Sequence, residues 1–141
     1  MMRPMIGQRT IWDPLRKKDV AHTPEEDVRQ WFIVQLQRLM GVPGHMMMSE
    51  VGFSLGQKKL RADIVVYGRD ASPVAVVECK RPDVALDRDV LDQAVRYNMV
   101  LNVRYIFITN GKSTFVCRRK AVEDPGYEFV GTLPSYDEMQ K

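Results

Sequence analysis

Apolar residues recur at helical spacing in the stretch that follows Thr23. One face of this stretch, with positions three or four residues apart, consists of Val28, Trp31, Phe32, Gln35, Leu36 and Leu39. Thr23 suits an N-cap, Pro24 suits the first helical position, and Glu26 stands three residues after the cap, which completes a capping box. Gly41 and Pro43 end the pattern. The spacing therefore predicts a first helix that buries this face.

Two adjacent glutamates at the start of this helix are expected to differ in direction. At about 100° per residue, Glu25 falls in the sector of Val28, Phe32 and Leu36, whereas Glu26 lies off it. We therefore expect Glu26 to cap the helix and Glu25 to point toward the surface on which the helix packs.

Apolar runs after residue 45 predict a set of strands. The expected strands are Met46–Leu55, Leu60–Tyr67, Val74–Lys80, Arg104–Thr109, Thr114–Arg118 and a short Tyr127–Val130. Asn110-Gly111 is the strongest hairpin signal in the chain. A second helix is expected over Leu86–Leu101 and a frayed one over Tyr136–Gln140. The order αβββαββ predicts an α/β fold in which helices flank a central mixed sheet.

The first 22 residues differ from the rest of the chain because they show no sustained periodicity. We interpret residues 1–22 as an N-terminal arm that wraps on the domain through Ile11, Trp12 and Leu15. Residues 23–141 are expected to form a single domain, since a chain of this length is typical of one globular unit.

Composition narrows the class of protein. Hydrophobic residues make up 45 % and charged residues 28 %, which excludes a disordered, collagen-like or coiled-coil chain. The sequence contains no run of 18 apolar residues, which a membrane-spanning helix would need. The first nine residues lack the apolar core of a secretion signal. Cys79 and Cys117 form neither a CxxC pair nor a disulfide framework. These features favour a cytoplasmic protein with reduced thiols.

Ionisable side chains stand at the ends of two strongly apolar strands. Glu78 and Lys80 share one face at the end of the strand Val74–Lys80, which is apolar on both faces and therefore expected at the centre of the sheet. Charges there cost free energy unless they serve each other or a ligand. Asp63 opens the apolar run of the preceding strand. If the two strands pair as a hairpin, two carboxylates and a lysine meet at one end of the sheet.

Such a group of side chains has a chemical use. Two close carboxylates repel each other unless a cation sits between them, and oxygen ligands suit Mg²⁺. A bound metal activates a water and stabilises charge that grows on a phosphoryl oxygen. Lys80 would hold or help to activate the attacking water, or steady the pentavalent phosphate. The residues alone leave a second interpretation open, in which Lys80 forms a buried ion pair with Glu78 or Asp63 that has no further role.

These residues resemble the D…(D/E)xK signature of PD-(D/E)xK nucleases. Further segments, in the same order, are similar to the N-terminal nuclease domain of type I restriction enzyme R subunits. The similar segments are Thr23–Gln30, Arg61–Tyr67, Val77–Lys80, Asp92–Asn98 and Thr109–Gly111. The resemblance covers about residues 23–118. It implies a restriction-endonuclease-like fold.

The resemblance also implies roles for individual residues. Asp63 and Glu78 would be metal ligands, and Lys80 would be the catalytic lysine. Glu25 would be the first-helix acid that binds the metal or orients its water. The cofactor would be Mg²⁺ or Mn²⁺.

A glutamine and a tyrosine on the second helix match the QxxxY motif that this family places beside its active site. They are Gln93 and Tyr97, one helical turn apart. From the residues alone, a helix–sheet hydrogen bond for Gln93 and core packing for Tyr97 stay open. Ala62 departs from the signature, which has proline there. Asn110–Ser113 is interpreted as a turn and not as a phosphate loop, because Ile106 stands where that loop requires glycine.

Together these features predict a metal-dependent endonuclease of the restriction type that hydrolyses DNA, without an ATP motor in this chain. DNA is expected to bind through Lys58, Lys59 and Arg61, because clustered cations attract phosphates. Restriction-modification subunits are further expected partners. A homodimer is expected because one active centre cuts one strand per visit. Two alternatives remain, a catalytically silent nuclease-fold module that binds DNA or a restriction-system partner, and a nuclease for RNA or junctions.

Overall fold

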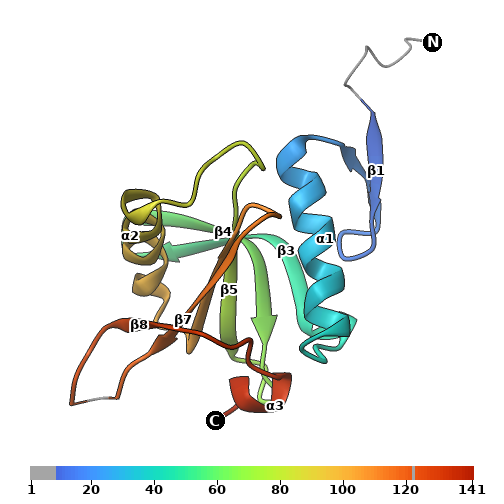
Figure 1. Ribbon diagram of the computed structural model, residues 1–141. Helices are drawn as coiled ribbons and strands as arrows, with labels where there is room; N and C mark the ends of the chain where they lie inside the picture. The colour runs from blue at the N-terminus through green and yellow to red at the C-terminus, as the bar shows by residue number, and fades with distance from the viewer. Residues whose placement is uncertain (1–8, 122) are drawn as a thin grey trace.

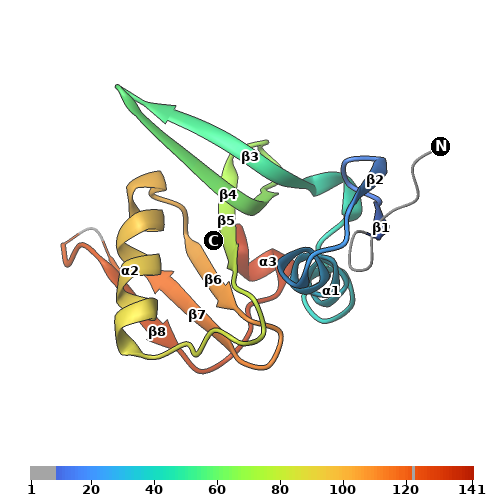
Figure 2. The ribbon, with the colours of Figure 1, turned by 90° about the horizontal axis from the view of Figure 1, so that it is seen from above.

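The structure is a computed structural model that describes residues 9–121 and 123–141. Its strands are β1 (Thr10–Asp13), β2 (Lys18–Ala21), β3 (Met47–Leu55), β4 (Lys58–Tyr67), β5 (Pro73–Cys79), β6 (Tyr105–Thr109), β7 (Thr114–Arg119) and β8 (Tyr127–Val130). Its helices are α1 (Pro24–Arg38), α2 (Arg88–Asn98) and α3 (Tyr136–Met139), with single 3₁₀ turns at Gly44–Met46 and Met99–Leu101. Figures 1 and 2 show these elements arranged around one central sheet.

The central sheet has six strands in the order β3-β4-β5-β6-β7-β8. Neighbouring strands are antiparallel except β5 and β6, which are parallel and are joined by the crossover through α2. The predicted pairing of the second and third strands is confirmed, because Ile64 of β4 stands opposite Val77 of β5. The structure thus confirms the mixed α/β layer fold expected from the pattern.

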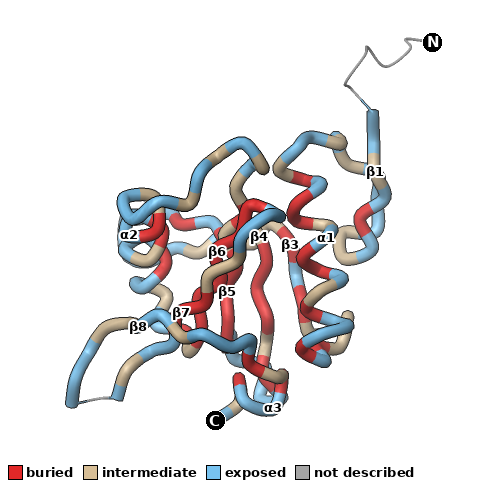
Figure 3. Tube along the Cα trace, in the orientation of Figure 1, coloured by how far each residue is buried: buried red, intermediate tan, exposed pale blue. Residues whose placement is uncertain are grey.

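Helices α1 and α2 cover opposite faces of the sheet and make two hydrophobic cores. On the α1 side, Phe32 and Leu36 pack in one cluster with Val77, while α2 packs in a second cluster that includes Val76. Adjacent residues of β5 therefore face different cores, as alternation requires. Figure 3 shows buried residues concentrated along the central strands and on the inner side of α1. The end of β5 lies between the two helices.

The face that α1 buries is displaced from the predicted one. Trp31 is 42 % exposed and Leu39, just after the helix, is 65 % exposed, although both were expected in the core. Ile33 and the charged Arg29 are buried instead. The buried sector is centred near Phe32 and includes Arg29, which a pattern of hydrophobic residues alone leaves out.

The start of α1 corrects the prediction for the two glutamates. The Thr23 hydroxyl accepts a hydrogen bond from the Glu26 amide at 3.0 Å, so the N-cap is confirmed. The Glu26 side chain, however, is buried and pairs with Arg16 and Arg29. Glu25 is the half-exposed one of the two. Glu26 is buried because the segment before the helix covers that side of α1.

That segment holds a hairpin that the sequence pattern missed. Strands β1 and β2 pair antiparallel, and Figure 2 shows them beside α1. Leu15 packs on the α1-side core, as expected, but Trp12 is 56 % exposed. Asp13 anchors the turn instead, since it is fully buried and accepts from the Leu15 amide. Residues 1–8 of the expected arm lie outside the described residues.

The remaining elements agree with the pattern apart from their limits. Helix α2 begins after Asp87, whose carboxylate accepts from the Val90 amide. It ends at Asn98, and the 3₁₀ turn Met99–Leu101 follows. The β6–β7 hairpin is confirmed, with Gly111 at φ +87° and the Asn110 side chain accepting from two turn amides. Among the described residues, no helix is long and apolar enough to cross a membrane.

Candidate functional site

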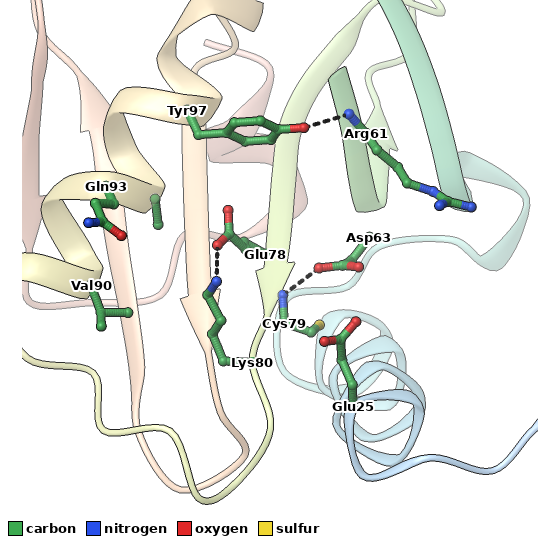
Figure 4. Close-up of a pocket in the computed structure, with 10 residues that line it drawn as sticks. Glu25, Arg61, Asp63, Glu78, Cys79, Lys80, Val90, Gln93 and Tyr97 are labelled. Atoms are coloured by element: carbon green, nitrogen blue, oxygen red, sulfur yellow. Dashed lines mark hydrogen bonds and ion pairs between the residues drawn. The ribbon is translucent and has the colours of Figure 1, made fainter. Parts of the chain in front are cut away.

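An open pocket of about 440 Å³ lies at the end of β5, between α1, α2 and β4 (Figure 4). Its lining includes seven residues that the sequence pattern singled out, namely Glu25, Arg61, Asp63, Glu78, Lys80, Gln93 and Tyr97. Within the described part of the chain, Lys58 and Lys59 lie outside this pocket, exposed at the tip of the β3–β4 hairpin. The pocket therefore collects the predicted catalytic residues but not the whole predicted basic cluster.

The register of β4 and β5 brings Asp63 and Glu78 together. Ile64 pairs with Val77, so Asp63 and Glu78 stand opposite each other along the strands, one step beyond the last paired residues. The Asp63 side chain lies on the α1 side of the pocket and the Glu78 side chain on the α2 side (Figure 4). There the Asp63 Oδ2 atom accepts a hydrogen bond from the Cys79 amide at 2.7 Å. The Asp63 side chain thus continues the contact between the strands where the backbone ladder stops.

Glu78 is held on the α2 side of the pocket. Its Oε2 atom lies 2.9 Å from Lys80 Nζ, and its Oε1 atom accepts from Asn98 Nδ2 at 2.8 Å. The same Asn98 nitrogen donates to the Ala94 carbonyl one helical turn earlier. The hydrogen bond to Glu78 raises the pKa of Lys80 above its usual value, although partial burial opposes it. Lys80 is therefore an ammonium group at neutral pH in this arrangement.

Asp63 is held on the α1 side by the buried Arg29. Arg29 NH2 lies 2.9 Å from Asp63 Oδ1 and 2.5 Å from Glu50 Oε1, and its NH1 pairs with Glu26. Burial alone would lower the pKa of Arg29, but the hydrogen bond and charge of Asp63 and the other two carboxylates raise it further above its usual value. The guanidinium is permanently charged and joins acids from α1, β3 and β4.

Glu25 reaches the pocket from the first turn of α1. Its carboxylate is 46 % exposed and lies 3.6 Å from Arg29. Partial burial and then the negative charge of Asp63 raise its pKa. In Figure 4, Glu25 and Asp63 lie together on the α1 side, and Glu78 and Lys80 lie together on the α2 side. Glu25 thus lines the pocket, although Glu26 and not Glu25 is the buried glutamate of α1.

The two α2 residues of the predicted QxxxY motif line the same pocket. The Tyr97 hydroxyl accepts a hydrogen bond from the Arg61 amide at 3.0 Å and so spans the distance from α2 to β4 (Figure 4). Tyr97 is 42 % exposed, which overturns the core-packing interpretation for this residue. Gln93 is exposed on α2, with its amide group in the pocket lining.

Three polar residues of the site were not identified from the sequence. Glu50 stands opposite Asp63 in the β3–β4 register and pairs with Arg29 and, at 2.6 Å, with Arg61. Its acidic side chain in an apolar strand was the available signal. Arg29 follows Glu25 and Glu26 by four and three residues, a spacing that favours ion pairs. Asn98 carried no signal of its own beyond its place next to the motif.

The donor set of the pocket suits a hard cation. Glu25, Asp63 and Glu78 offer only carboxylate oxygens, and no cysteine thiolate competes, since burial raises the pKa of Cys79 well above its usual value. Among residues 9–121 and 123–141, no three acidic, histidine or cysteine side chains stand close enough to hold an ion together. Mg²⁺ commonly binds through one or two carboxylates and keeps several waters, so these residues fit it.

Comparison with known proteins identifies the family of this chain. Residues 24–134 match the family described as type I restriction enzyme R protein N terminus. A solved fragment from Vibrio vulnificus YJ016, named as a candidate HsdR subunit of a type I restriction enzyme, superposes with a TM-score of 0.60 at 20 % identity. The match covers 82 % of this chain but only 24 % of that one. No curated protein matches the sequence.

A second solved structure supports the fold over almost the whole length. It is a candidate nuclease of the DUF820 group from Anabaena variabilis ATCC 29413, with a TM-score of 0.50 at 10 % identity. The match covers 94 % of this chain and 89 % of that one. The α/β fold with its six-stranded sheet is therefore restriction-endonuclease-like, as expected from the sequence.

Proposed function

Because the chain belongs to the family of type I restriction enzyme R protein N termini, we propose that it is a metal-dependent nuclease domain that hydrolyses phosphodiester bonds of DNA. One observation carries the proposal. Asp63, Glu78 and Lys80, which come from two strands and the residue after them, line one pocket with Glu25. A purely structural ion pair would need neither the second carboxylate nor an open pocket.

In this proposal each residue has a separate task. Asp63 and Glu78 hold Mg²⁺ or Mn²⁺ through carboxylate oxygens, and Glu25 orients a water at the α1 side. When bound, the metal supplies an activated water and stabilises negative charge on a phosphoryl oxygen. Lys80, an ammonium beside Glu78, donates to the phosphate oxygen on which charge develops. Gln93 and Tyr97 position these groups from α2.

The nucleic acid is proposed to approach along the β3–β4 hairpin. Lys58 and Lys59 are exposed near its tip, and Arg61 is 70 % exposed at the pocket edge. This row of cations leads from the hairpin tip to the carboxylates. Binding through it is expected to weaken steeply with salt, because phosphate contacts release counterions.

The test is cleavage of supercoiled plasmid, linear duplex, single-stranded DNA and RNA with Mg²⁺, Mn²⁺ or Ca²⁺. We expect DNA cleavage with Mg²⁺ and Mn²⁺ but not with Ca²⁺, which is larger and less polarising. Glu78→Gln keeps the size of the side chain but removes the charge that holds the metal, so cleavage is lost. Glu128→Gln is the matched control, since Glu128 forms an exposed ion pair with Arg118 on β7.

A second candidate function is a catalytically silent module that binds DNA or a restriction-system partner. The favouring observation is that Asp63 and Glu78 are each paired with a cation, Arg29 and Lys80. Purified protein that binds DNA but cuts no nucleic acid with Mg²⁺ or Mn²⁺ would establish this function in place of the first. Cleavage of RNA but not of DNA would instead show that the substrate of the nuclease is RNA.

The proposed partners follow from the family. The chain spans about a quarter of the Vibrio chain that it matches. From its family we propose that it works with restriction-modification subunits that deliver DNA in the cytoplasm. We also propose a homodimer for double-strand cleavage. Light scattering that shows a monomer at tens of micromolar protein would contradict the homodimer.

A further inference from the structure

A row of alternating charges runs from the β1–β2 hairpin to the pocket. Arg16 pairs with Asp13 in the hairpin, and its NH2 lies 2.7 Å from Glu26 Oε1 on α1. The same Glu26 oxygen pairs with Arg29. Arg29 in turn lies 2.9 Å from Asp63 Oδ1. We call Asp13, Arg16, Glu26 and Arg29 the charge relay.

Every member of the charge relay is held on more than one side. Asp13 is fully buried, and Glu26 and Arg29 are each 4 % exposed. The second Glu26 oxygen accepts from Gln30 at 2.8 Å. Buried charges keep their geometry only while all their partners are present, because removing one partner leaves an uncompensated charge. A substitution at one end of the relay is therefore expected to displace the side chains at the other end.

Glu50 indicates that the relay serves the pocket. It has a left-handed backbone, with φ +56°, in the middle of β3, a conformation that costs a non-glycine residue free energy. That conformation places the Glu50 carboxylate between Arg29 and Arg61. Local backbone strain is thus retained at the point where Arg29 meets Asp63.

We propose that the β1–β2 hairpin is a positioning element of the candidate active site. Arg16 fixes Glu26, Glu26 fixes Arg29, and Arg29 fixes the Asp63 carboxylate that faces the pocket. Arg16 and Arg29 are positioning residues, since neither belongs to the pocket lining. This inference rests on the proposed nuclease function only where metal binding is the measurement.

The sign of the effect on metal affinity separates positioning from simple charge. Arg16 is a cation, so removing it would strengthen metal binding if only long-range charge mattered. If Arg16 positions Asp63 through the relay, its removal weakens metal binding. Loss of a residue that orients a metal ligand typically costs about 10-fold or more in affinity.

The experiment compares Arg16→Met with Arg118→Met in the full chain. Arg118 also forms an ion pair, with Glu128, but on β7 far along the sheet from β4. The first measurement is the amide NMR signal of Cys79 without metal, because that amide donates to Asp63. The second is Mn²⁺ affinity by calorimetry. Arg16→Met should shift the Cys79 signal and weaken Mn²⁺ binding about 10-fold, and Arg118→Met should change neither.

Two outcomes overturn the inference. One is an unmoved Cys79 signal in folded Arg16→Met, and the other is unchanged or tighter Mn²⁺ binding. Arg16→Lys carries the same test if Arg16→Met does not fold, since it keeps the charge but cannot bridge Asp13 and Glu26 as a guanidinium does. If the unchanged protein binds no Mn²⁺, the proposed nuclease function fails, and the Cys79 signal still decides on the relay.

Discussion

The two carboxylates of the pocket are held in contrasting ways. Asp63 is paired with Arg29, whose side chain is only 5 % exposed and which contacts acids on α1 and β3 as well. Glu78 is paired with Lys80, which is 35 % exposed, and with the buried Asn98. One side of the pocket is therefore a buried ionic network, and the other is a short, partly solvated pair.

This difference indicates that the two sides of the pocket have different roles. A planar guanidinium that joins several carboxylates fixes their directions, whereas an ammonium on a flexible stem moves with little cost. We infer that the α1 side of the pocket sets the position of Asp63, and that the α2 side supplies the group that acts on the phosphate. The following predictions test this division.

The largest expected effect is on stability. Arg29→Met leaves Glu26, Glu50 and Asp63 without their shared cation, so the free energy of unfolding should fall by about 3–5 kcal/mol. Lys80→Met should lower it by less than about 1 kcal/mol, as for other solvated pairs. Urea denaturation measures both. Equal losses in the two variants would show that the two sides do not differ.

The second prediction concerns catalysis, for which the α2 side of the pocket is expected to matter more than the α1 side. Lys80→Ala should reduce DNA cleavage by about 100-fold or more, because it removes a donor to the charge that develops on the phosphate. Its Mn²⁺ affinity should stay nearly unchanged, since lysine is not a ligand. Cleavage rates and calorimetry on the same preparation measure the two effects. A variant that loses metal binding in parallel with cleavage would show that Lys80 instead supports the site.

The smallest expected effect is on how the stability of the protein depends on pH in acid, through the buried carboxylate of Asp13. Burial alone would raise the pKa of Asp13, but hydrogen bonds from Arg16, the Leu15 amide and Gln30 lower it overall. A lowered folded-state pKa stabilises the protein above the unfolded value of about 3.9, and this contribution is lost as the pH falls through the folded value. Asp13→Asn should therefore be less stable at pH 7 but lose less stability between pH 5 and pH 2. Parallel curves of unfolding free energy against pH would contradict this.

The sequence was sufficient for the parts of the site that lie on regular strands. Asp63, Glu78 and Lys80 are unusual because they interrupt or end apolar runs. Strand alternation gives the side of Glu78, which it shares with Val76, but not that of Asp63, which pairs with Arg29 on the α1 side. The order and pairing of β4 and β5 followed from the same runs and a short turn. These predictions depend on local pattern, which the structure preserves.

The parts that were missed depend on contacts between distant segments. Glu50 acquires its place only through the β3–β4 register, and Arg29 is buried only because acids from β3 and β4 surround it. The β1–β2 hairpin lacks hydrophobic periodicity, since the buried Asp13 and not an apolar residue anchors it. Trp31 was assigned to the core from its hydrophobicity, although the polar network displaces the buried face of α1 away from it.

The single parallel pair of the sheet has a consequence for the order of folding. Strands β3, β4 and β5 follow one another through short turns, so they can form with little loss of chain entropy. Pairing of β5 with β6 must first close the crossover that contains α2, and contacts of this kind form slowly. We therefore expect the β3–β4–β5 meander that carries Glu50 and Asp63 to form early. The Glu78 side is completed late, when docking of the crossover brings Asn98 to Glu78 and Lys80 to the Thr109 carbonyl.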